Sequence, residues 1–487
     1  MLPDLLEKLE QYIDIFTRED EELYIQEISN REAYTYLSAE IPLIDCPDQE
    51  IERTYYFRWW TFRKHWKETP YGHILSEFLP EVPWAGPYNS IICSASHHLR
   101  EGRWLKDNNH WMKEYIEFWL NDHGDVFSYS SWFISALYDY LSLHPDTAYV
   151  KKILPRLVAF FEDQEQRHLH STGLYWSMDC RDGMEYSISG PGLRPTINSY
   201  MLGDACALAK LAALAGETDL ADKYHMKTQK IRQLMDQLLW DGDFYKTIPC
   251  DRDGAIKKMC RPEVNTANDV RELIGYLPWY FYTPDAERGA AFSQLKDPDG
   301  FAAKAGLTTA EQRHPRFLFK HEHECLWNGY IWPFATAQTL TALANALRSG
   351  NGLPINRQDY CDMLHQYAAS HKRILDDGTI KDWIDENMHP YSGIWEAREE
   401  LRADSWNPQR GGYERGKDYN HSTFCDLVLS GLFGIEYKEG VLTAHPLITD
   451  TWEYFCVTNL TAKNYTVLYD KTGNHYGMGT GLKIFCK

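Results

Sequence analysis

Carboxylates in two long polar segments are the side chains of this sequence best suited to chemistry. Glu185 lies in the segment 176–200, whereas Glu386 and Glu414 lie in the segment 376–420. Two carboxyl groups on either side of a glycosidic bond can break it, because one protonates the leaving oxygen while the other activates water or attacks the sugar. For any single acid among the 70 in the chain, a helix cap or an arginine partner is the commoner role. The loop context that the three acids share makes them candidates.

The segment 176–200 reads WSMDCRDGMEYSISGPGLRPTINSY. It places two aspartates and an arginine close to Glu185, and its later glycines, prolines and serines disfavour a helix over most of its length. A helix expected over 199–215, closed by Gly216, follows directly and anchors the loop. Anchored loops rich in ionisable groups usually line a site, so this segment is the first candidate for one.

Three other motifs point to different chemistry, and each is weaker. The sequence HEHEC at 321–325 matches neither HExxH nor a zinc-type spacing, so we expect no metal and no cofactor. Asn420-His421-Ser422 lacks the Gly-x-Ser-x-Gly elbow of many serine hydrolases. The glycine-rich stretch 477–481 is similar to a phosphate loop, but the chain ends before a helix could follow it, which favours a simple turn.

Helical segments and loops alternate through most of the chain and must position these acids. Apolar residues recur at helical spacing over 3–18, 55–63, 108–121, 129–144, 147–168, 199–215, 219–239, 286–295, 334–348, 358–375 and 422–433. Paired helices in tandem on this scale predict a mainly α fold that closes into an α/α toroid. A toroid would bring the loops that carry the three acids to one mouth.

The residues from 440 onward have a different sequence pattern. Alternating apolar residues predict strands at 441–444, 465–469 and 482–485, with a hairpin turn at 470–474. We therefore expect two parts: a helical catalytic domain at 1–439, and a small antiparallel sheet at 440–487 that is docked on it.

Composition excludes several classes of protein. Of the 487 residues, 44% are hydrophobic and 14% aromatic, which indicates a globular chain with a large core. A net charge of −20 without a long basic run argues against binding nucleic acid. No stretch approaches the ~18 apolar residues of a membrane span, and the N-terminus lacks the pattern of a signal peptide. Eleven scattered cysteines without a Cys-x-x-Cys pair indicate reduced thiols in a cytoplasmic protein.

Four motifs in order resemble those of a known group of enzymes: DGMEYS at 182–187 with RPTINSY at 194–200, WNGYIWP at 327–333, ENMHPYSG at 386–393, and RGKDYNHS at 415–422. The group is the (α/α)6-barrel glycoside hydrolases of the trehalase, family 63 and mannosylglycerate hydrolase kind. The motifs are also similar to those of family 142-type β-L-arabinofuranosidases. The resemblance covers nearly the whole chain. It implies a six-hairpin glycosidase, a small carbohydrate substrate and no cofactor.

The resemblance also implies roles for individual residues. Glu185 falls where the group has an aspartate as general acid, so this chain departs from the pattern by one methylene. Glu414 sits where trehalases carry the general base, although their following F-x-W segment is absent here, and Glu386 is the second choice. Residues expected to stack on the sugar or bind its hydroxyls are Arg58, Trp59, Trp132, Trp176, Asp182, Asn198, Asn265, Trp327, Asn328, Trp332, Glu386 and His421.

The resemblance thus implies an inverting glycoside hydrolase with Glu185 as acid and Glu414 as base. The many loops favour a pocket rather than an open groove, and hence exo action. Two alternatives stay open. A phosphate-dependent phosphorylase would use Arg415 and Lys417 to hold phosphate, and a relative without catalysis would only bind sugar. The sequence does not identify the sugar, because the direction of one side chain decides which hydroxyl is recognised. It does not give the oligomeric state either.

Overall fold

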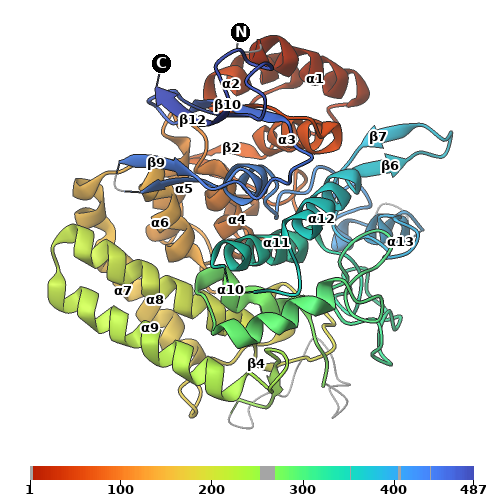
Figure 1. The fold of residues 1–487 in the computed structure, drawn as a ribbon. Coiled ribbons are helices and arrows are strands. Elements are labelled where there is room, and N and C mark those ends of the chain that lie inside the picture. Colours follow the sequence, from red (N-terminus) through yellow and green to blue (C-terminus); the bar gives the residue numbers. More distant parts are fainter. Residues whose placement is uncertain (1–3, 253–268, 351, 404–406, 439, 487) are drawn as a thin grey trace.

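The computed structural model describes residues 4–252, 269–350, 352–403, 407–438 and 440–486 and shows a mainly helical chain with small antiparallel sheets (Figure 1). The helices are α1 Leu5–Glu19, α2 Ala33–Glu40, α3 Gln49–Arg63, α4 Ile92–Gly102, α5 Trp111–Leu120, α6 Phe133–Leu143, α7 Thr147–His168, α8 Pro195–Ala215, α9 Thr218–Leu238, α10 Leu277–Phe281, α11 Pro333–Arg348, α12 Arg357–Ala369 and α13 Glu396–Ala403. Shorter helical turns lie at Asp179–Asp182, Leu273–Tyr276 and Ala286–Leu295, and a π-helical segment lies at Leu427–Leu432.

The helix ends follow from local chemistry. Asp146 precedes α7, and its side chain accepts a hydrogen bond from the backbone N–H of Tyr149, which satisfies one of the free donors of the first turn. Pro195 opens α8 at a position where its missing N–H costs nothing. Gly216 closes α8 with φ +86°, a conformation that glycine adopts without steric cost. The long antiparallel pair of α8 and α9 follows from this turn (Figure 1).

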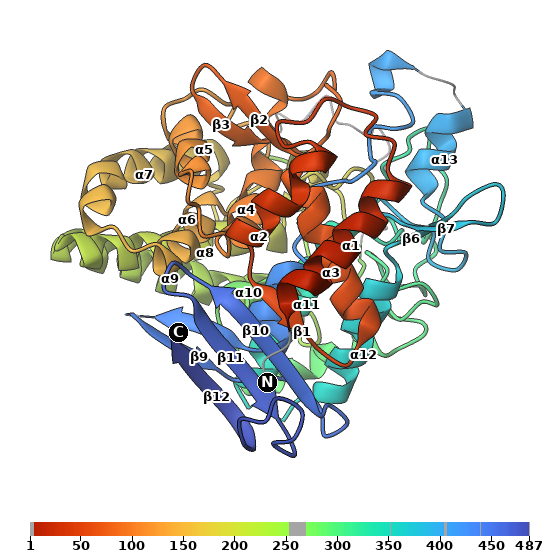
Figure 2. The same ribbon diagram turned by 90° about the horizontal axis from the view of Figure 1, so that it is seen from above.

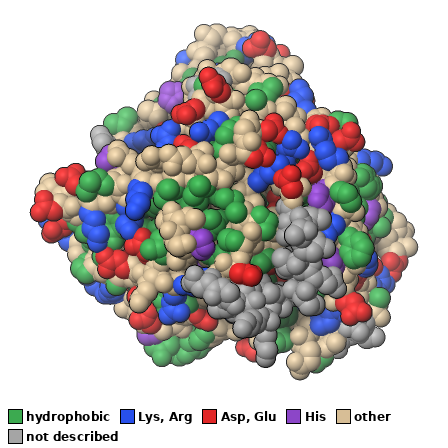
Figure 3. All heavy atoms as spheres, turned by 90° about the horizontal axis from the view of Figure 1, so that it is seen from below, with side chains coloured by type: hydrophobic (Ala, Val, Ile, Leu, Met, Phe, Trp, Pro, Cys, Tyr) green, Lys and Arg blue, Asp and Glu red, His purple; other side chains and the backbone are tan. Residues whose placement is uncertain are grey.

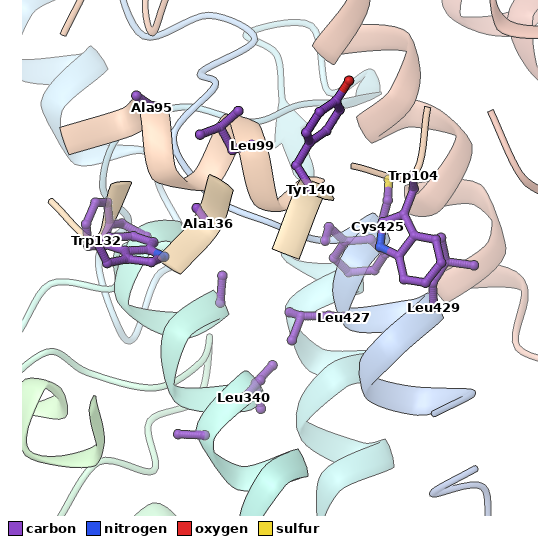
Figure 4. Close-up of a cluster of buried hydrophobic side chains, with 14 of the residues drawn as sticks. Ala95, Leu99, Trp104, Trp132, Ala136, Tyr140, Leu340, Cys425, Leu427 and Leu429 are labelled. Atoms are coloured by element: carbon purple, nitrogen blue, oxygen red, sulfur yellow. The ribbon is translucent and has the colours of Figure 1, made fainter. Parts of the chain in front are cut away.

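The centre of the core lies where α4, α6 and α11 meet the segment Leu427–Leu432. Leu99, Ala136, Leu340 and Leu427 pack there with the indole ring of Trp132, and all five are fully or almost fully buried (Figure 4). Close packing of this kind fixes the ends of these helices relative to one another. The loops that begin these elements are therefore held in place by the core.

In the part of the chain that the structure describes, strands form one four-stranded sheet and four two-stranded ones. The larger sheet has the antiparallel order β1-β10-β11-β12, from Leu43–Asp45, Tyr454–Leu460, Tyr465–Asp470 and Gly481–Cys486. The pairs are β2 Trp66–Thr69 with β3 Gly72–Leu75, β4 Gly192–Leu193 with β5 Ile248–Pro249, β6 Lys372–Ile374 with β7 Ile380–Asp382, and β8 Ile435–Lys438 with β9 Val441–Ala444. The predicted strands at 441–444, 465–469 and 482–485 are confirmed as β9, β11 and β12.

The C-terminal sheet is joined to the N-terminal part of the chain. Strand β1, in a stretch that lies within residues 41–52, pairs with β10 through Leu43 and Thr458. Helix α1, near the start of the described chain, packs beside β1 (Figure 2). Because β1 leads directly into α3, the chain itself links the sheet to the helical body.

One helix prediction and one loop prediction near Glu386 differ from the structure. The helix expected over 358–375 ends at Ala369, because the chain turns there and enters strand β6. The segment 376–420, expected to be a loop, contains β7 and the short helix α13. Neither difference changes the mainly helical fold, but both shape the neighbourhood of Glu386.

The cysteines depart in part from the expectation of reduced thiols. Cys180, in the turn Asp179–Asp182, is disulfide-bonded. Nine other described cysteines are thiols, and five of these are buried. A disulfide is the state that an oxidising compartment favours, so the cytoplasmic location stays a prediction.

The surface carries charges of both signs. On the face seen from below, acidic and basic side chains are interspersed among apolar ones (Figure 3). Within the described ranges, no helix has the length and apolar character needed to cross a bilayer.

Candidate active site

A pocket of about 630 Å³ lies among loops that are far apart in the sequence. This volume is within the usual range for small-molecule sites. The pocket is lined by Glu77, Phe78, Trp84, Ile91, Cys93, Tyr129, Met178, Cys180, Arg181, Gly183, Glu185, Tyr186, His323, Glu324, Cys325, Trp332, Glu386, Arg415, Tyr419 and His421.

Many of these residues lie in segments that lead into a helix. Cys93 is in the first turn of α4, Tyr129 precedes α6, and residues 178–186 precede α8. Residues 323–332 lead into α11, and residues 415–421 lead into Leu427–Leu432. The pocket is therefore lined by the segments that precede several helices.

Glu185 lies in the loop between Asp179–Asp182 and β4. The backbone N–H of Trp327 donates to the Glu185 backbone oxygen at 3.0 Å, which ties this loop to the one before α11. The Glu185 side chain is partly exposed and lines the pocket. Burial raises its pKa to about 8, and the charges of Asp179, Glu386 and Glu77 add to the rise. A carboxyl group with this pKa carries a proton at neutral pH and can act as an acid.

Glu386 is a second carboxyl group in the same pocket. The Arg415 guanidinium donates from Nε to Oε1 at 3.0 Å and from Nη2 to Oε2 at 2.9 Å. Glu386 is 2% exposed, and burial raises its pKa to about 7 although Arg415 acts in the opposite direction. The bidentate contact fixes the orientation of the carboxylate, and a pKa near neutrality suits a general base.

Arg415 also holds a third acid. Its Nη1 lies 2.8 Å from Oε1 of Glu324, which forms a further ion pair with Arg410. Burial opposes ionisation of Glu324, but the two arginines outweigh it and hold its pKa at about 2. Glu324 is thus ionised throughout the neutral range, and Arg415 joins two loops by bridging two carboxylates.

Glu77 supplies a fourth carboxyl group, from the loop that follows β3. Its Oε1 accepts hydrogen bonds from Tyr419 Oη and from His421 Nδ1, both at 2.8 Å. Cys93 Sγ lies 4.0 Å from its Oε2. Glu77 is 4% exposed, so its carboxylate is held firmly where it meets the pocket.

Aromatic rings complete the wall. Trp332 lines the pocket and stacks on Trp327, with ring centroids 4.5 Å apart and an interplanar angle of 14°. Phe78, Trp84 and Tyr186 also line it. Aromatic rings beside carboxylates form a surface that suits a molecule with apolar faces and many hydroxyl groups, which is the character of a sugar.

The loop that carries Glu185 is anchored by a buried ion pair. Arg194 Nε donates to Asp182 Oδ2 at 2.6 Å, and both side chains are fully buried. Ser130 and Ser177 donate to the other oxygen of Asp182 at 2.7 and 2.8 Å. This network holds the two ends of the loop together.

We expect Asp182→Asn to lower the free energy of unfolding by about 3 kcal/mol, because it leaves Arg194 as a buried charge without its carboxylate. Thermal unfolding followed by circular dichroism measures the change. Asp163→Asn, at an exposed position of α7, is the control and should unfold like the wild type. An unchanged melting temperature for Asp182→Asn would show that the pair does not anchor the loop.

The structure favours neither a metal site at 321–325 nor a phosphate pocket at Arg415 and Lys417. His323, Glu324 and Cys325 place their ligand atoms within 4.8 Å of one another, but Arg410 and Arg415 contact Glu324, and cations repel a metal ion. A phosphate pocket would need free cations, whereas Arg415 is paired with two glutamates and Lys417 lies 2.8 Å from Asp20.

The predicted residues fall into three sets. Those that line the pocket are Glu185, Glu386, Trp332 and His421. Those that the structure places outside the lining, in the core or in loop-anchoring bonds, are Arg58, Trp59, Trp132, Trp176, Asp182, Asn198, Trp327 and Asn328. Asn265 lies outside the described residues.

Glu414 also lies outside the lining. Its carboxylate pairs with Arg398, which in turn contacts Asp385 at 3.2 Å. Arg58 donates from Nη2 to the Ser422 backbone oxygen at 2.9 Å, so it holds the end of the loop 415–422 in place. These placements leave Glu386 as the base candidate that shares the pocket with Glu185.

Several lining residues carried no expectation from the sequence, among them Glu77, Cys93, Tyr129 and Tyr419, and Arg415 was expected only as a phosphate ligand. Arg415 and Tyr419 belong to the motif at 415–422, so their place near the site was within reach. Glu77 had a weaker signal, because it precedes the proline-rich loop whose Trp84 also lines the pocket.

Comparisons with known proteins give the family of the chain. The model of the mannosylglycerate hydrolase MGH1-like glycoside hydrolase domain matches residues 87–422. A solved structure named "Sialidase" is 34% identical over 99% of this chain, with a TM-score of 0.86. This chain spans 43% of the length of that protein.

Two more distant structures share the fold. The GH78 family rhamnosidase of Bacillus sp. GL1 is 14% identical, with a TM-score of 0.52, over 88% of this chain and 40% of that one. The GH63 mannosylglycerate hydrolase from Thermus thermophilus, solved with Tris, is 11% identical, with a TM-score of 0.50, over 74% of this chain and 97% of that one.

Proposed function

The chain belongs to the mannosylglycerate hydrolase MGH1-like glycoside hydrolase family, and on that premise we propose that it is an exo-acting, inverting O-glycosidase. Glu185 is the general acid and Glu386 the general base. The proposed scaffold is an (α/α)6 toroid formed by residues 1–439, with the sheet of residues 440–487 as an appendage.

One observation carries the proposal: two carboxyl groups line one pocket in environments that separate their roles. Burial raises the pKa of Glu185 to about 8, whereas Glu386 is bound by Arg415 and has a pKa of about 7. Burial raises both pKa values, and of two carboxyl groups in a shared pocket the one without a cationic partner is the one that keeps its proton. Catalysis is also a better account than sugar binding alone, because binding needs no protonated carboxyl group.

The proposed reaction is a single displacement. Glu185 gives its proton to the glycosidic oxygen as the bond to the anomeric carbon breaks, and Glu386 takes a proton from a water that attacks the opposite face. Inversion requires room for that water, which corresponds to a carboxyl separation of ~6.5–9.5 Å. Arg415 keeps the Glu386 carboxylate aimed at the water.

The substrate class follows from the pocket. A volume of about 630 Å³ suits a terminal sugar and a short remainder, and favours exo action on a small glycoside. Arg415 is neutralised by Glu324 and Glu386. We therefore propose a neutral terminal sugar at the site of cleavage, although the related structures include one named "Sialidase".

The pH dependence of kcat/KM should be bell-shaped, with a maximum between about pH 7 and pH 8. Activity should fall below a pKa of about 7, where Glu386 gains a proton, and above a pKa of about 8, where Glu185 loses one. Because the two groups interact, the limbs belong to the pair. Initial rates from about pH 5 to 10 measure this, and an acidic optimum below about pH 6 would contradict the assignment.

The test of the function is a panel of α- and β-glycosides, pyranosides and furanosides, with neutral and carboxylated terminal sugars. Proton NMR of the first-formed sugar shows whether the anomeric configuration inverts. Turnover that depends on inorganic phosphate would indicate a phosphorylase, and sugar binding without any turnover would indicate a non-catalytic relative. Hydrolysis with retention would exclude the water-activating role of Glu386.

A further inference from the structure

Glu77 is a buried acid of the pocket that the proposed reaction does not use. Its two oxygens differ in their surroundings. Oε1 receives two hydrogen bonds, from Tyr419 Oη and His421 Nδ1, and these occupy both of its lone pairs. For Oε2, the described contact is Cys93 Sγ at 4.0 Å, and a thiol is a weak donor.

Because of this difference, Oε2 of Glu77 can still accept hydrogen bonds from a ligand. A carboxylate oxygen can accept two hydrogen bonds, and Glu77 is 4% exposed, so bulk water satisfies little of it. The pocket is also lined by Glu386 and Glu324, whose carboxylates add further hydrogen-bond acceptors. A ligand that brings hydroxyl donors complements such a site, whereas a ligand that brings an anion does not.

We propose that Glu77 is a specificity-determining residue and that its Oε2 accepts a hydrogen bond from one hydroxyl group of the terminal sugar. The identity of the ligand rests on the proposed function, whereas the acceptor geometry is independent of it. A hydrogen bond to a charged acceptor discriminates strongly, because a sugar without that hydroxyl leaves a buried carboxylate without its partner. Tyr419 and His421 are then positioning residues, which hold Oε1 and so direct Oε2.

The competing explanation is purely structural. Glu77 could serve only as a link between the loop after β3 and the loop 415–421, through its contacts with Tyr419 and His421. The backbone N–H of Asn420 also donates to the Glu77 backbone oxygen at 3.2 Å, which supports such a link. A link would affect all substrates equally, whereas an acceptor for a hydroxyl group affects only the one it recognises.

The experiment is a double-mutant cycle in which Glu77 is changed in the protein and single hydroxyl groups are removed from the substrate. Wild type, Glu77→Gln and Tyr419→Phe are assayed on the glycoside that the panel identifies and on its monodeoxy analogues. The exposed Glu81→Gln is the matched control. Tyr419→Phe keeps the carboxylate but removes one donor to Oε1, so it remains informative if Glu77→Gln folds poorly.

We expect wild type to lose about 10- to 100-fold in kcat/KM when one particular hydroxyl is removed. Glu77→Gln should show little further loss on that same analogue, while it still discriminates the others. Tyr419→Phe should show a smaller effect of the same kind, and Glu81→Gln none. Equal losses on every analogue in wild type and Glu77→Gln would overturn the proposal.

A binding arm separates this inference from the proposed function. Quenching of tryptophan fluorescence by free L-arabinose, L-rhamnose, D-mannose and D-glucose, and by their monodeoxy forms, is measured with wild type and Glu77→Gln. If the protein turns over a glycoside but the effect of Glu77→Gln is the same for every analogue, the inference about Glu77 is wrong and the proposed function stands. If the effect of Glu77→Gln on sugar binding depends on one hydroxyl but no glycoside is turned over, the proposed function is wrong and the inference about Glu77 stands. No turnover and no sugar binding defeat both.

Discussion

Glu185→Gln should lower kcat/KM by roughly 10³-fold on a glycoside whose leaving group is a poor one, such as a sugar alkoxide. Glutamine has nearly the same shape but cannot release a proton to the leaving oxygen. On a glycoside with a dinitrophenolate leaving group, which departs without a proton, the loss should be far smaller. The dependence on leaving group is the signature of an acid.

The variant should also lose the alkaline limb of the pH profile. In wild type, kcat/KM falls above a pKa of about 8 because Glu185 loses its proton. Without that group, the residual activity should stay level through about pH 9. Kinetics with both classes of leaving group and circular dichroism of the variant provide the measurement.

Glu322→Gln is the matched control for this experiment, because Glu322 is exposed in the loop before α11 and is absent from the described pocket lining. It should retain wild-type rates. If Glu185→Gln stayed fully active on the poor leaving group, or lost equally on both classes, the role of acid would pass to another residue.

The periodic parts of the fold were predictable from the sequence. Apolar spacing located α7 and α9 closely, and Gly216 marked the end of α8. Local signals failed where tertiary contacts decide. The strand β6 ends a helical pattern at Ala369, because its residues pair with Ile380–Asp382. Strand β1 is only three residues long and is recognisable only once its partner β10 is known.

The candidate site was predictable where chemistry and loop context coincided. Glu185 and Glu386 both line the pocket, as their place in polar loops indicated. The aromatic residues were harder, because a ring that stacks on a sugar and a ring that fills the core have the same signal in sequence. Trp59 and Trp132 proved to be core residues, and the indole of Trp332 lines the pocket.

Ion pairs explain why the choice between bases needed the structure. Glu386, Glu414 and Glu324 are each paired with an arginine, and only three-dimensional proximity shows which arginine belongs to which acid. Arg415 binds Glu324 and Glu386, which line the pocket, whereas Arg398 binds Glu414 outside the lining. No sequence spacing encodes that difference.

Glu386→Ala should therefore lower kcat/KM by roughly 10³-fold on all substrates, whatever the leaving group, because activation of water is lost in every case. The acidic limb near a pKa of about 7 should disappear with it. Arg415 keeps its ion pair with Glu324, so the loop should stay folded, and thermal unfolding checks this.

Added azide distinguishes a lost base from a damaged site. A small anion can enter the space left by the Glu386 side chain and attack the anomeric carbon without a base, so Glu386→Ala should regain activity and release a glycosyl azide of inverted configuration. Glu414→Ala is the decisive companion. If Glu386 is the base, Glu414→Ala should keep most of its activity and give no azide product. The reverse pattern would return the role of base to Glu414, and would require the loop 407–421 to rearrange so that the carboxylate leaves Arg398 and enters the pocket.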